Sequence, residues 1–323
     1  MTPMRTLVLL MAISLASCAS TKPSLSSMPK SGFVEVPGGP VWYEVMSEGE
    51  GTPLVILHGG PGSTSCGYQR LGKLNDNRPV IRYDQLGTGR SGRPDDTSLW
   101  NRDRFVEELD ALRDALGLEE IHLLGHSWGG SLAAYYFLET GGEGVRSLIL
   151  SSPLISTPVW IRDANKLRKT LPQEVQDTLA FHEKEGTIDS GAYKQASDVF
   201  YDRFVYRGEA VEPFECPDAP WNSLIYNQMW GPTEFYATGS LSDFDLTPRL
   251  NDIDVPTLFM TGEFDEAVPE STERFANMVP GARFQVIPGV AHASLSRAPE
   301  QYREIVRAFL ADVENSQSAE MDR

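Results

Sequence analysis

The chain has 323 residues, of which 41% are hydrophobic and 23% charged, a composition typical of a globular protein with one large domain or a domain and an insertion. Its formal net charge of -17 argues against nucleic acid as a partner, because phosphate binding depends on an excess of Lys and Arg. The same negative charge would attract a substrate that carries a positive group, although solubility alone explains most of it.

The N-terminal segment 1–17 has the pattern of a bacterial secretory signal. Its apolar run, 7–15, is too short to span a bilayer as a helix. Leu15-Ala16-Ser17-Cys18 then matches a lipobox, which predicts cleavage before Cys18 and lipidation of its sulfur. An ordinary signal peptide with a chance cysteine is the alternative.

We expect a flexible tether over 18–31. Because the residue after Cys18 is not Asp, we expect the protein at the periplasmic face of the outer membrane, held there only by its lipid anchor.

Short apolar runs alternate with helical patterns in two parts of the chain, 32–151 and 256–314. The expected strands cover 33–36, 41–46, 53–57, 79–83, 120–124, 145–151, 256–261 and 283–287. The expected helices cover 101–116, 131–139, 270–278 and 301–313, with a frayed end over 314–323. This order predicts an α/β fold with a mostly parallel, doubly wound sheet.

The segment 152–255 interrupts the alternation. It contains no short buried strand, is helical in pattern and is dense in aromatic residues. A loop of this length without structure of its own is not expected in a compact domain. We therefore predict a helical cap that is inserted after the sixth strand and covers the active site.

A nucleophile elbow is predicted at Gly125-His126-Ser127-Trp128-Gly129. An apolar run enters this G-x-S-x-G sequence and a helical pattern leaves it, which is the strand–turn–helix context that the α/β-hydrolase elbow requires. The two glycines leave room where a Cβ would clash. Ser127 is therefore the candidate nucleophile, and a strand-to-helix turn without a catalytic role is the alternative.

A second glycine-rich loop, His58-Gly59-Gly60-Pro61-Gly62, directly follows the buried strand 53–57. In the α/β-hydrolase fold the loop at this place supplies one N–H group of the oxyanion hole, and the residue after the nucleophile supplies the other. We assign the two donors to Gly60 and Trp128. A tight glycine turn without this role is the alternative.

Ser127, Asp265 and His292 follow one another in the Ser–Asp–His order of α/β-hydrolases, each just past the end of a predicted strand. His292 would accept the proton of the Ser127 hydroxyl, and Asp265 would orient the imidazole. Glu263 and Glu266 are rivals of Asp265 for the acid, and a surface-loop role for Asp265 is the alternative.

Cysteine usage leaves one question open. Cys66 and Cys216 either form a disulfide between core and cap, as an exported protein permits, or remain unpaired small apolar residues. No Cys/His spacing suggests a metal site, and no motif calls for a cofactor.

The chain resembles the prolyl aminopeptidase (proline iminopeptidase) family over about residues 33–312, and most of all the branch with the archaeal tricorn-interacting aminopeptidase. The motifs that carry the resemblance are His58-Gly59-Gly60-Pro61-Gly62, Tyr83-Asp84-Gln85-x-Gly87-x-Gly89-x-Ser91, Gly125-His126-Ser127-Trp128-Gly129-Gly130, Gly231-Pro232-Thr233-Glu234-Phe235 and Gly262-Glu263-x-Asp265. The resemblance implies an α/β-hydrolase that removes the N-terminal residue, often proline, from short peptides.

The resemblance also implies that Glu234 and Glu266 bind the free amine of the substrate. Fixed carboxylates hold an ammonium by charge-assisted hydrogen bonds. A solvated loop for Glu266 and a helix-start acid for Glu234 are the alternatives.

The leading hypothesis is a serine hydrolase that releases an N-terminal residue, proline or another small or apolar one, through an acyl-enzyme. An amino-acid or aryl amidase, and a carboxylesterase or lactonase with the same triad, are alternatives. A ligand-binding lipoprotein on a hydrolase scaffold is the rival outside enzymes. The expected partner is a small peptide or amide with a free amine. The sequence leaves the oligomeric state and the preferred first residue undecided.

Overall fold

The computed structural model describes residues 25–211 and 220–321. The signal segment, Cys18 and most of the tether lie outside these residues, and so does Cys216. Cys66 is disulfide-bonded, and each of the two other cysteines of the chain lies outside the described residues. Within the described ranges, no helix is long and apolar enough to cross a membrane.

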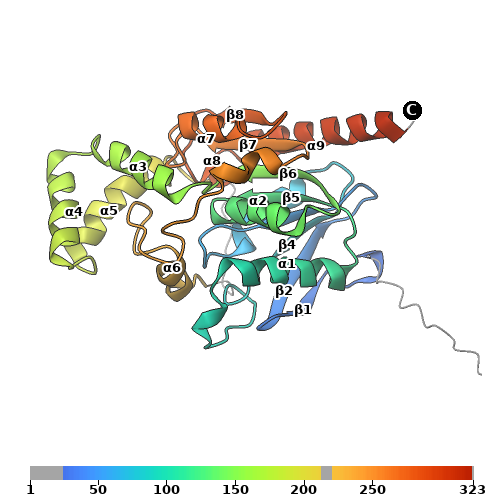
Figure 1. The fold of residues 1–323 in the computed structure, drawn as a ribbon, viewed down its shortest axis with the longest axis horizontal. Coiled ribbons are helices and arrows are strands. Elements are labelled where there is room, and N and C mark those ends of the chain that lie inside the picture. The colour runs from blue at the N-terminus through green and yellow to red at the C-terminus, as the bar shows by residue number, and fades with distance from the viewer. Residues whose placement is uncertain (1–24, 212–219, 322–323) are drawn as a thin grey trace, which may run out of the picture.

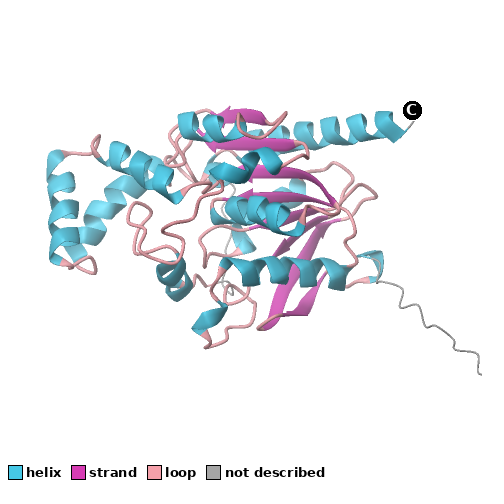
Figure 2. Cartoon of the chain, in the orientation of Figure 1, coloured by secondary structure: helices cyan, strands magenta, loops and turns pink. Residues whose placement is uncertain are grey.

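An eight-stranded sheet forms the centre of the described structure (Figure 2). Its strands are β1 (Ser31–Val36), β2 (Gly39–Ser47), β3 (Leu54–Leu57), β4 (Val80–Tyr83), β5 (Ile121–His126), β6 (Val145–Ser151), β7 (Thr257–Gly262) and β8 (Arg283–Ile287). Their order across the sheet is β1-β2-β4-β3-β5-β6-β7-β8. β2 pairs antiparallel with both β1 and β4, and the remaining pairs are parallel. Each strand expected from the sequence overlaps one of these.

Helices cover both faces of the sheet. The core helices are α1 (Arg102–Leu116), α2 (Trp128–Thr140), α7 (Pro269–Ala276), α8 (Ser294–Arg297) and α9 (Pro299–Met321), with the 3₁₀ segments η1 (Leu25–Ser27), η2 (Ser65–Lys73), η3 (Thr97–Leu99) and η4 (Thr247–Asp252). Side chains of α1, α2 and α7 share one apolar cluster, and those of η2, α8 and α9 share another. Leu123 and Leu124 of β5 belong to different clusters because successive side chains of a strand point to opposite faces. This arrangement confirms the predicted doubly wound α/β-hydrolase fold.

The helices α3 (Thr157–Arg168), α4 (Gln173–Glu185), α5 (Gly191–Phe204) and α6 (Ser223–Met229) lie in the segment between β6 and β7. Figure 1 shows α3, α4 and α5 projecting to one side of the sheet. These three helices have an apolar core of their own, to which Leu179, Phe200 and Phe235 contribute. Residues of α6, such as Ile225 and Met229, instead belong to an apolar cluster of the core. We refer to 152–255 as the cap.

The C-terminal helix is longer than the sequence analysis predicted. α9 continues to Met321, whereas we expected a frayed end from 314. Tertiary contacts account for the difference. The guanidinium of the buried Arg78 donates to Glu314 over 2.9 Å, and Arg146 donates to the side chain of Gln317 over 3.2 Å. The polar sequence of the last turns gives no sign of either contact.

Candidate active site

Ser127 lies in the sharp turn between β5 and α2. Its φ of 56° and ψ of -123° are unusual for a residue with a side chain, which is the strain expected of a nucleophile elbow. A Cβ at Gly125 would lie 2.0 Å from the carbonyl oxygen of Gly129, and one at Gly129 would lie 2.0 Å from that of Leu57. The two glycines of the motif are therefore required by the crossing of strand and helix.

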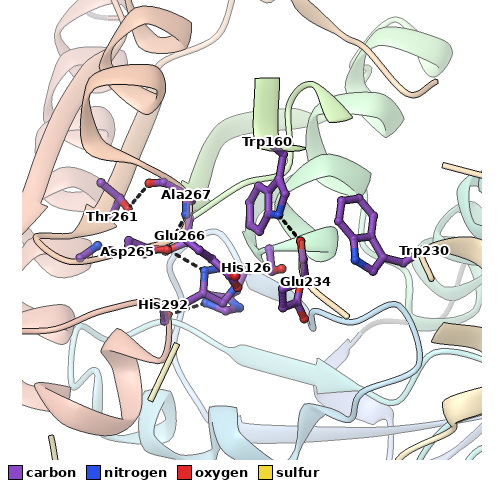
Figure 3. A network of polar contacts seen from close by, with 12 residues as sticks. His126, Trp160, Trp230, Glu234, Thr261, Asp265, Glu266, Ala267 and His292 are labelled. Atoms are coloured by element: carbon purple, nitrogen blue, oxygen red, sulfur yellow. Dashed lines mark hydrogen bonds and ion pairs between the residues drawn. The ribbon is translucent and has the colours of Figure 1, made fainter. Parts of the chain in front are cut away.

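Asp265 and His292 approach each other from the loops after β7 and β8, as Figure 3 shows. Nδ1–H of His292 donates to Oδ1 of Asp265 over 2.8 Å. Asp265 also accepts from the hydroxyl of Ser152 over 2.6 Å and from the backbone N–H of Ala267 over 2.8 Å. These contacts fix the acid and leave Nε2 of the imidazole available for proton transfer.

Asp265 and His292 each stabilise the charged form of the other. Burial alone would raise the pKa of Asp265, but the charge and hydrogen bond of His292, with the hydrogen bond of Ser152, hold that pKa below its ordinary value. Burial disfavours the charged imidazole, yet the negative charges of Asp265 and Glu234 raise the pKa of His292. Asp265 therefore stays ionised and stabilises the imidazolium that forms when His292 accepts a proton.

A cavity of about 350 Å³ joins the candidate residues. Ser127, His292, Gly60 and Glu234 all line it. Ser127 is only 8% exposed, so a substrate carbonyl reaches it by entering this cavity. The structure thus places the three members of the predicted triad together, at the ends of three parallel strands.

The segments that carry the two predicted oxyanion donors both adjoin the nucleophile. Trp128 is the first residue of α2, and a helix leaves the N–H groups of its first turn without internal partners. Gly60 has a φ of +113°, and a Cβ there would lie 2.6 Å from the backbone N of Gly62. The loop presses against the elbow, since a Cβ at Gly59 would lie 3.1 Å from Cβ of Ser127. The assignment of Gly60 and Trp128 as donors stays a prediction.

Glu266 is a buried carboxylate next to the base. It is 1% exposed, and neither of its carboxylate oxygens has a hydrogen-bond partner among the described residues. Burial, followed by repulsion from Glu234 and Asp265, raises its pKa well above that of an ordinary glutamate. Buried polar groups are normally hydrogen-bonded, so this carboxylate is suited to a donor other than those that the described residues supply.

Glu234 brings a second carboxylate to the site from the cap, close to the first (Figure 3). The hydroxyl of Tyr226 donates to its Oε1 over 2.7 Å, and the indole of Trp160 donates to its backbone carbonyl over 2.8 Å. The residue is partly exposed, but protein atoms surround its carboxyl group, and this burial raises the pKa of Glu234 against the opposing charge of His292. Two acidic groups that repel each other form a site suited to a cation.

Several residues at the site were not singled out by the sequence analysis. The hydroxyl of Ser152 and the imidazole of His126 touch the triad directly. Nε2–H of His126 donates to the carbonyl of His292 over 3.0 Å, and the two rings are 4.6 Å apart. Burial, with the nearby charge of His292, lowers the pKa of His126 to about 4, so it stays neutral. The position of His126 inside the elbow was its only signal in the sequence.

Three tyrosines of the cap, Tyr201, Tyr206 and Tyr226, lie near the carboxylate pair. Burial raises the pKa of each, and the charges of Glu234 and Glu266 raise it further. In the sequence they are three among the many aromatic residues of 152–255. Nothing in their spacing separates a tyrosine that faces the site from one that packs in the cap core.

Comparison with known proteins agrees with this geometry. Residues 52–299 match the family model described as alpha/beta hydrolase fold. The proline iminopeptidase of Heyndrickxia coagulans is 46% identical over 285 residues, which cover 87% of this chain and 99% of that protein. The proline iminopeptidase of Clostridium botulinum is 37% identical and covers 83% of this chain and 94% of its own length. The crystal structure of proline iminopeptidase from Mycobacterium smegmatis superposes with a TM-score of 0.78 at 33% identity, covering 89% of this chain and 99% of that one.

Proposed function

The chain belongs to the proline iminopeptidase family of α/β-hydrolases, and from this membership and its site we propose that it is a serine aminopeptidase that cleaves N-terminal proline from short peptides. The observation that carries the proposal is the buried carboxylate of Glu266, which has no hydrogen-bond partner among the described residues and interacts with Glu234, a residue that lines the same cavity as Ser127. An esterase with the same triad has no need for two such groups.

The reaction begins when the substrate ammonium binds between Glu234 and Glu266 by charge-assisted hydrogen bonds. This places the carbonyl of the first residue at Ser127. His292 takes the proton of the Ser127 hydroxyl as its oxygen attacks the carbonyl carbon, and Asp265 stabilises the imidazolium. His292 then gives the proton to the leaving amine, and an acyl-enzyme remains.

Water completes the cycle. His292 removes a proton from a water molecule that attacks the acyl-enzyme, and returns it to the Ser127 oxygen as the free amino acid leaves. In both halves of the reaction the carbonyl oxygen becomes negatively charged, and the N–H groups of Gly60 and Trp128 stabilise it. The enzyme needs no metal for these steps.

A comparison of substrates tests the proposal. We expect the purified protein to hydrolyse L-prolyl-β-naphthylamide and to lose at least about 100-fold in kcat/KM on its N-acetylated twin, because acetylation removes the charge that the two glutamates bind. Alanyl and phenylalanyl β-naphthylamides measure the preference for proline, and p-nitrophenyl acetate measures general esterase activity. Ester hydrolysis with no demand for a free amine would reject the aminopeptidase and favour a general esterase.

We propose further that the protein is exported and carries a lipid on Cys18 at the periplasmic face of the outer membrane. The support is the sequence alone, namely the apolar run 7–15 and the lipobox that ends at Cys18. Labelling with palmitate and fractionation of cells test this. Wild-type protein should carry the label and sediment with outer membranes, whereas Cys18→Ala should carry none. Unlabelled wild-type protein in the cytoplasmic fraction would refute it.

A further inference from the structure

The glycine-rich loop that contains Gly60 is held at its first end by a side-chain amide of the core and at its other end by a backbone N–H of the cap. At its first residue, Nε2–H of Gln85 donates to the carbonyl of His58 over 2.9 Å. Oε1 of the same Gln85 accepts from the indole N–H of Trp128 over 3.1 Å. One buried side chain of the core therefore joins the two segments that carry the candidate oxyanion donors.

At the other end of the loop the partner comes from the cap. The backbone N–H of Asn222 donates to the carbonyl of Gly62 over 2.8 Å. The side-chain Nδ2–H of Asn222 donates to the carbonyl of Gly87 over 2.8 Å. Asn222 thus joins the loop of Gly60 to the second glycine-rich loop, 84–92, which also contains Gln85.

The same residue fixes the cap helix that follows it. Oδ1 of Asn222 accepts from the backbone N–H groups of Leu224 and Ile225, over 3.1 and 3.4 Å, and so caps the N-terminus of α6. With these contacts, both the oxygen and the nitrogen of the amide have partners. The side chain of Asn222 therefore links α6 to the loop 84–92, and its backbone N–H links the same residue to the loop of Gly60.

Close packing makes the link stiff. A Cβ at Gly62 would lie 2.5 Å from the carbonyl oxygen of Asn222, and one at Gly87 would lie 2.5 Å from Cδ1 of Ile225. The cap therefore lies directly against the two glycines, with backbone at Gly62 and with the side chain of Ile225 at Gly87, and a shift of α6 displaces the loops with it. Oxyanion stabilisation depends on donors that are held in place before the reaction.

We infer that Asn222 is a positioning residue that holds the N–H of Gly60 in the oxyanion hole and makes its geometry depend on the docking of the cap. The inference deepens the proposed function and rests on the oxyanion role given there to Gly60. Asn222 acts through Gly62 and Gly87, so its loss affects the transition state, in which the oxyanion exists, and leaves binding of the substrate ammonium intact.

Asn222→Ser is the main test, because serine still caps a helix but has no amide N–H for the carbonyl of Gly87. We expect kcat for L-prolyl-β-naphthylamide to fall about tenfold, a part of the loss that removal of a whole oxyanion donor causes, while KM changes less than about twofold. The inhibition constant of pyrrolidine-2-boronic acid, which places a tetrahedral oxygen in the oxyanion hole, should rise by the same factor as kcat falls. The inhibition constant of the product L-proline should not change.

Asn101→Ser is a matched control. Asn101 caps α1 by accepting from the N–H of Arg104 over 3.0 Å, and its amide donates to the carbonyl of Ser98 over 2.8 Å. The substitution removes the same kind of hydrogen bond from an exposed helix start that is not part of the site. We expect kcat within about twofold of the wild type.

Equal kcat in the Asn222 and Asn101 variants, or a loss in Asn222→Ser that appears only in KM, would overturn the inference. If Asn222→Ser does not fold, Asn222→Asp replaces it, since aspartate keeps the size and the cap but offers only oxygens to the carbonyl of Gly87. The same loss of kcat is expected. Failure of the proposed function has a different result: the wild type would then not hydrolyse prolyl amides. Turnover of p-nitrophenyl acetate, which also needs the oxyanion hole, would still test Asn222.

Discussion

Oε1 of Glu266 lies 3.9 Å from Nε2 of His292, while the adjacent Asp265 binds the opposite nitrogen of the same ring over 2.8 Å. The carboxylates of two consecutive residues thus lie near the two nitrogens of one imidazole. Asp265 is saturated with hydrogen bonds and Glu266 has none among the described residues. We therefore propose separate functions for them: the first orients the base, and the second binds the substrate.

Replacement of Glu266 should affect binding of amines specifically. For Glu266→Gln we expect KM for L-prolyl-β-naphthylamide to rise about 10- to 100-fold, which corresponds to the loss of a hydrogen bond between charged groups worth roughly 1.5–3 kcal/mol. Turnover of p-nitrophenyl acetate should change less than about threefold. Steady-state kinetics on both substrates provide the measurement.

Glu263→Gln is the control for this prediction. Glu263 lies on the same loop, but its carboxylate accepts from the exposed backbone N–H of Gly289 over 2.8 Å. We expect near wild-type kinetics on both substrates. An equal loss on amide and ester in Glu266→Gln would contradict its role in amine binding.

Ser127→Ala should abolish turnover and keep the fold. We expect kcat to fall by at least on the order of a thousandfold, because no other group attacks the carbonyl. A fluorophosphonate probe, which reacts with activated serines, should label the wild type and leave the variant unlabelled. The melting temperature should stay within a few degrees, since the substitution removes one oxygen that faces the cavity. Labelling of the variant would assign the nucleophile to another residue.

The acid limb of the pH profile should depend on Glu234. His292 acts as a base only when neutral, and its pKa is raised, so activity falls as the pH drops through a value above the ordinary 6.5. The negative charge of Glu234 contributes to this rise. In Glu234→Gln that contribution is lost, and the acid limb of kcat/KM should move to lower pH. An ester without an amine is the substrate to use, because it does not involve binding of the ammonium. An acid limb that stays at the same pH or moves to higher pH would contradict the prediction.

Gly125→Ala should prevent folding. Its Cβ would lie 2.0 Å from the carbonyl oxygen of Gly129, a backbone atom that cannot move without breaking the elbow. We expect a loss of at least about 4 kcal/mol in the free energy of unfolding, or an insoluble protein. Gly191→Ala is the matched control, because a Cβ there meets nothing within 4 Å and the residue starts α5. Denaturant titration of both variants makes the comparison, and soluble Gly125→Ala of normal stability would be inconsistent with the elbow geometry.

The core and the candidate triad could be predicted because their signals are local. Strand β3 is a run of four buried apolar residues, and β5 leads directly into the glycines of the elbow. In a parallel sheet the residues after successive strands meet at one edge, so chain order alone brought Ser127, Asp265 and His292 together. Helix periodicity likewise placed α1 within one residue of its observed start.

Long-range contacts explain what the sequence did not reveal. The last turns of α9 are held by Arg78 and Arg146, which lie far away in the chain. Asn222 looks like any polar residue in a loop, and its importance comes from the carbonyls of Gly62 and Gly87 that the fold brings to it. Neither composition nor periodicity contains such information.

Glu234 lines the same cavity as Ser127 and interacts electrostatically with the buried Glu266, and the proposed role of the two in amine binding determines what becomes of a longer substrate. With its ammonium bound by these two residues, a peptide enters by its N-terminus and advances by a single residue. Each cycle therefore exposes a new terminus, and trimming continues only until a residue that does not fit stands first. Digestion of a peptide mixture should leave truncated peptides that share a resistant first residue. Folded proteins whose N-termini are buried should not be degraded.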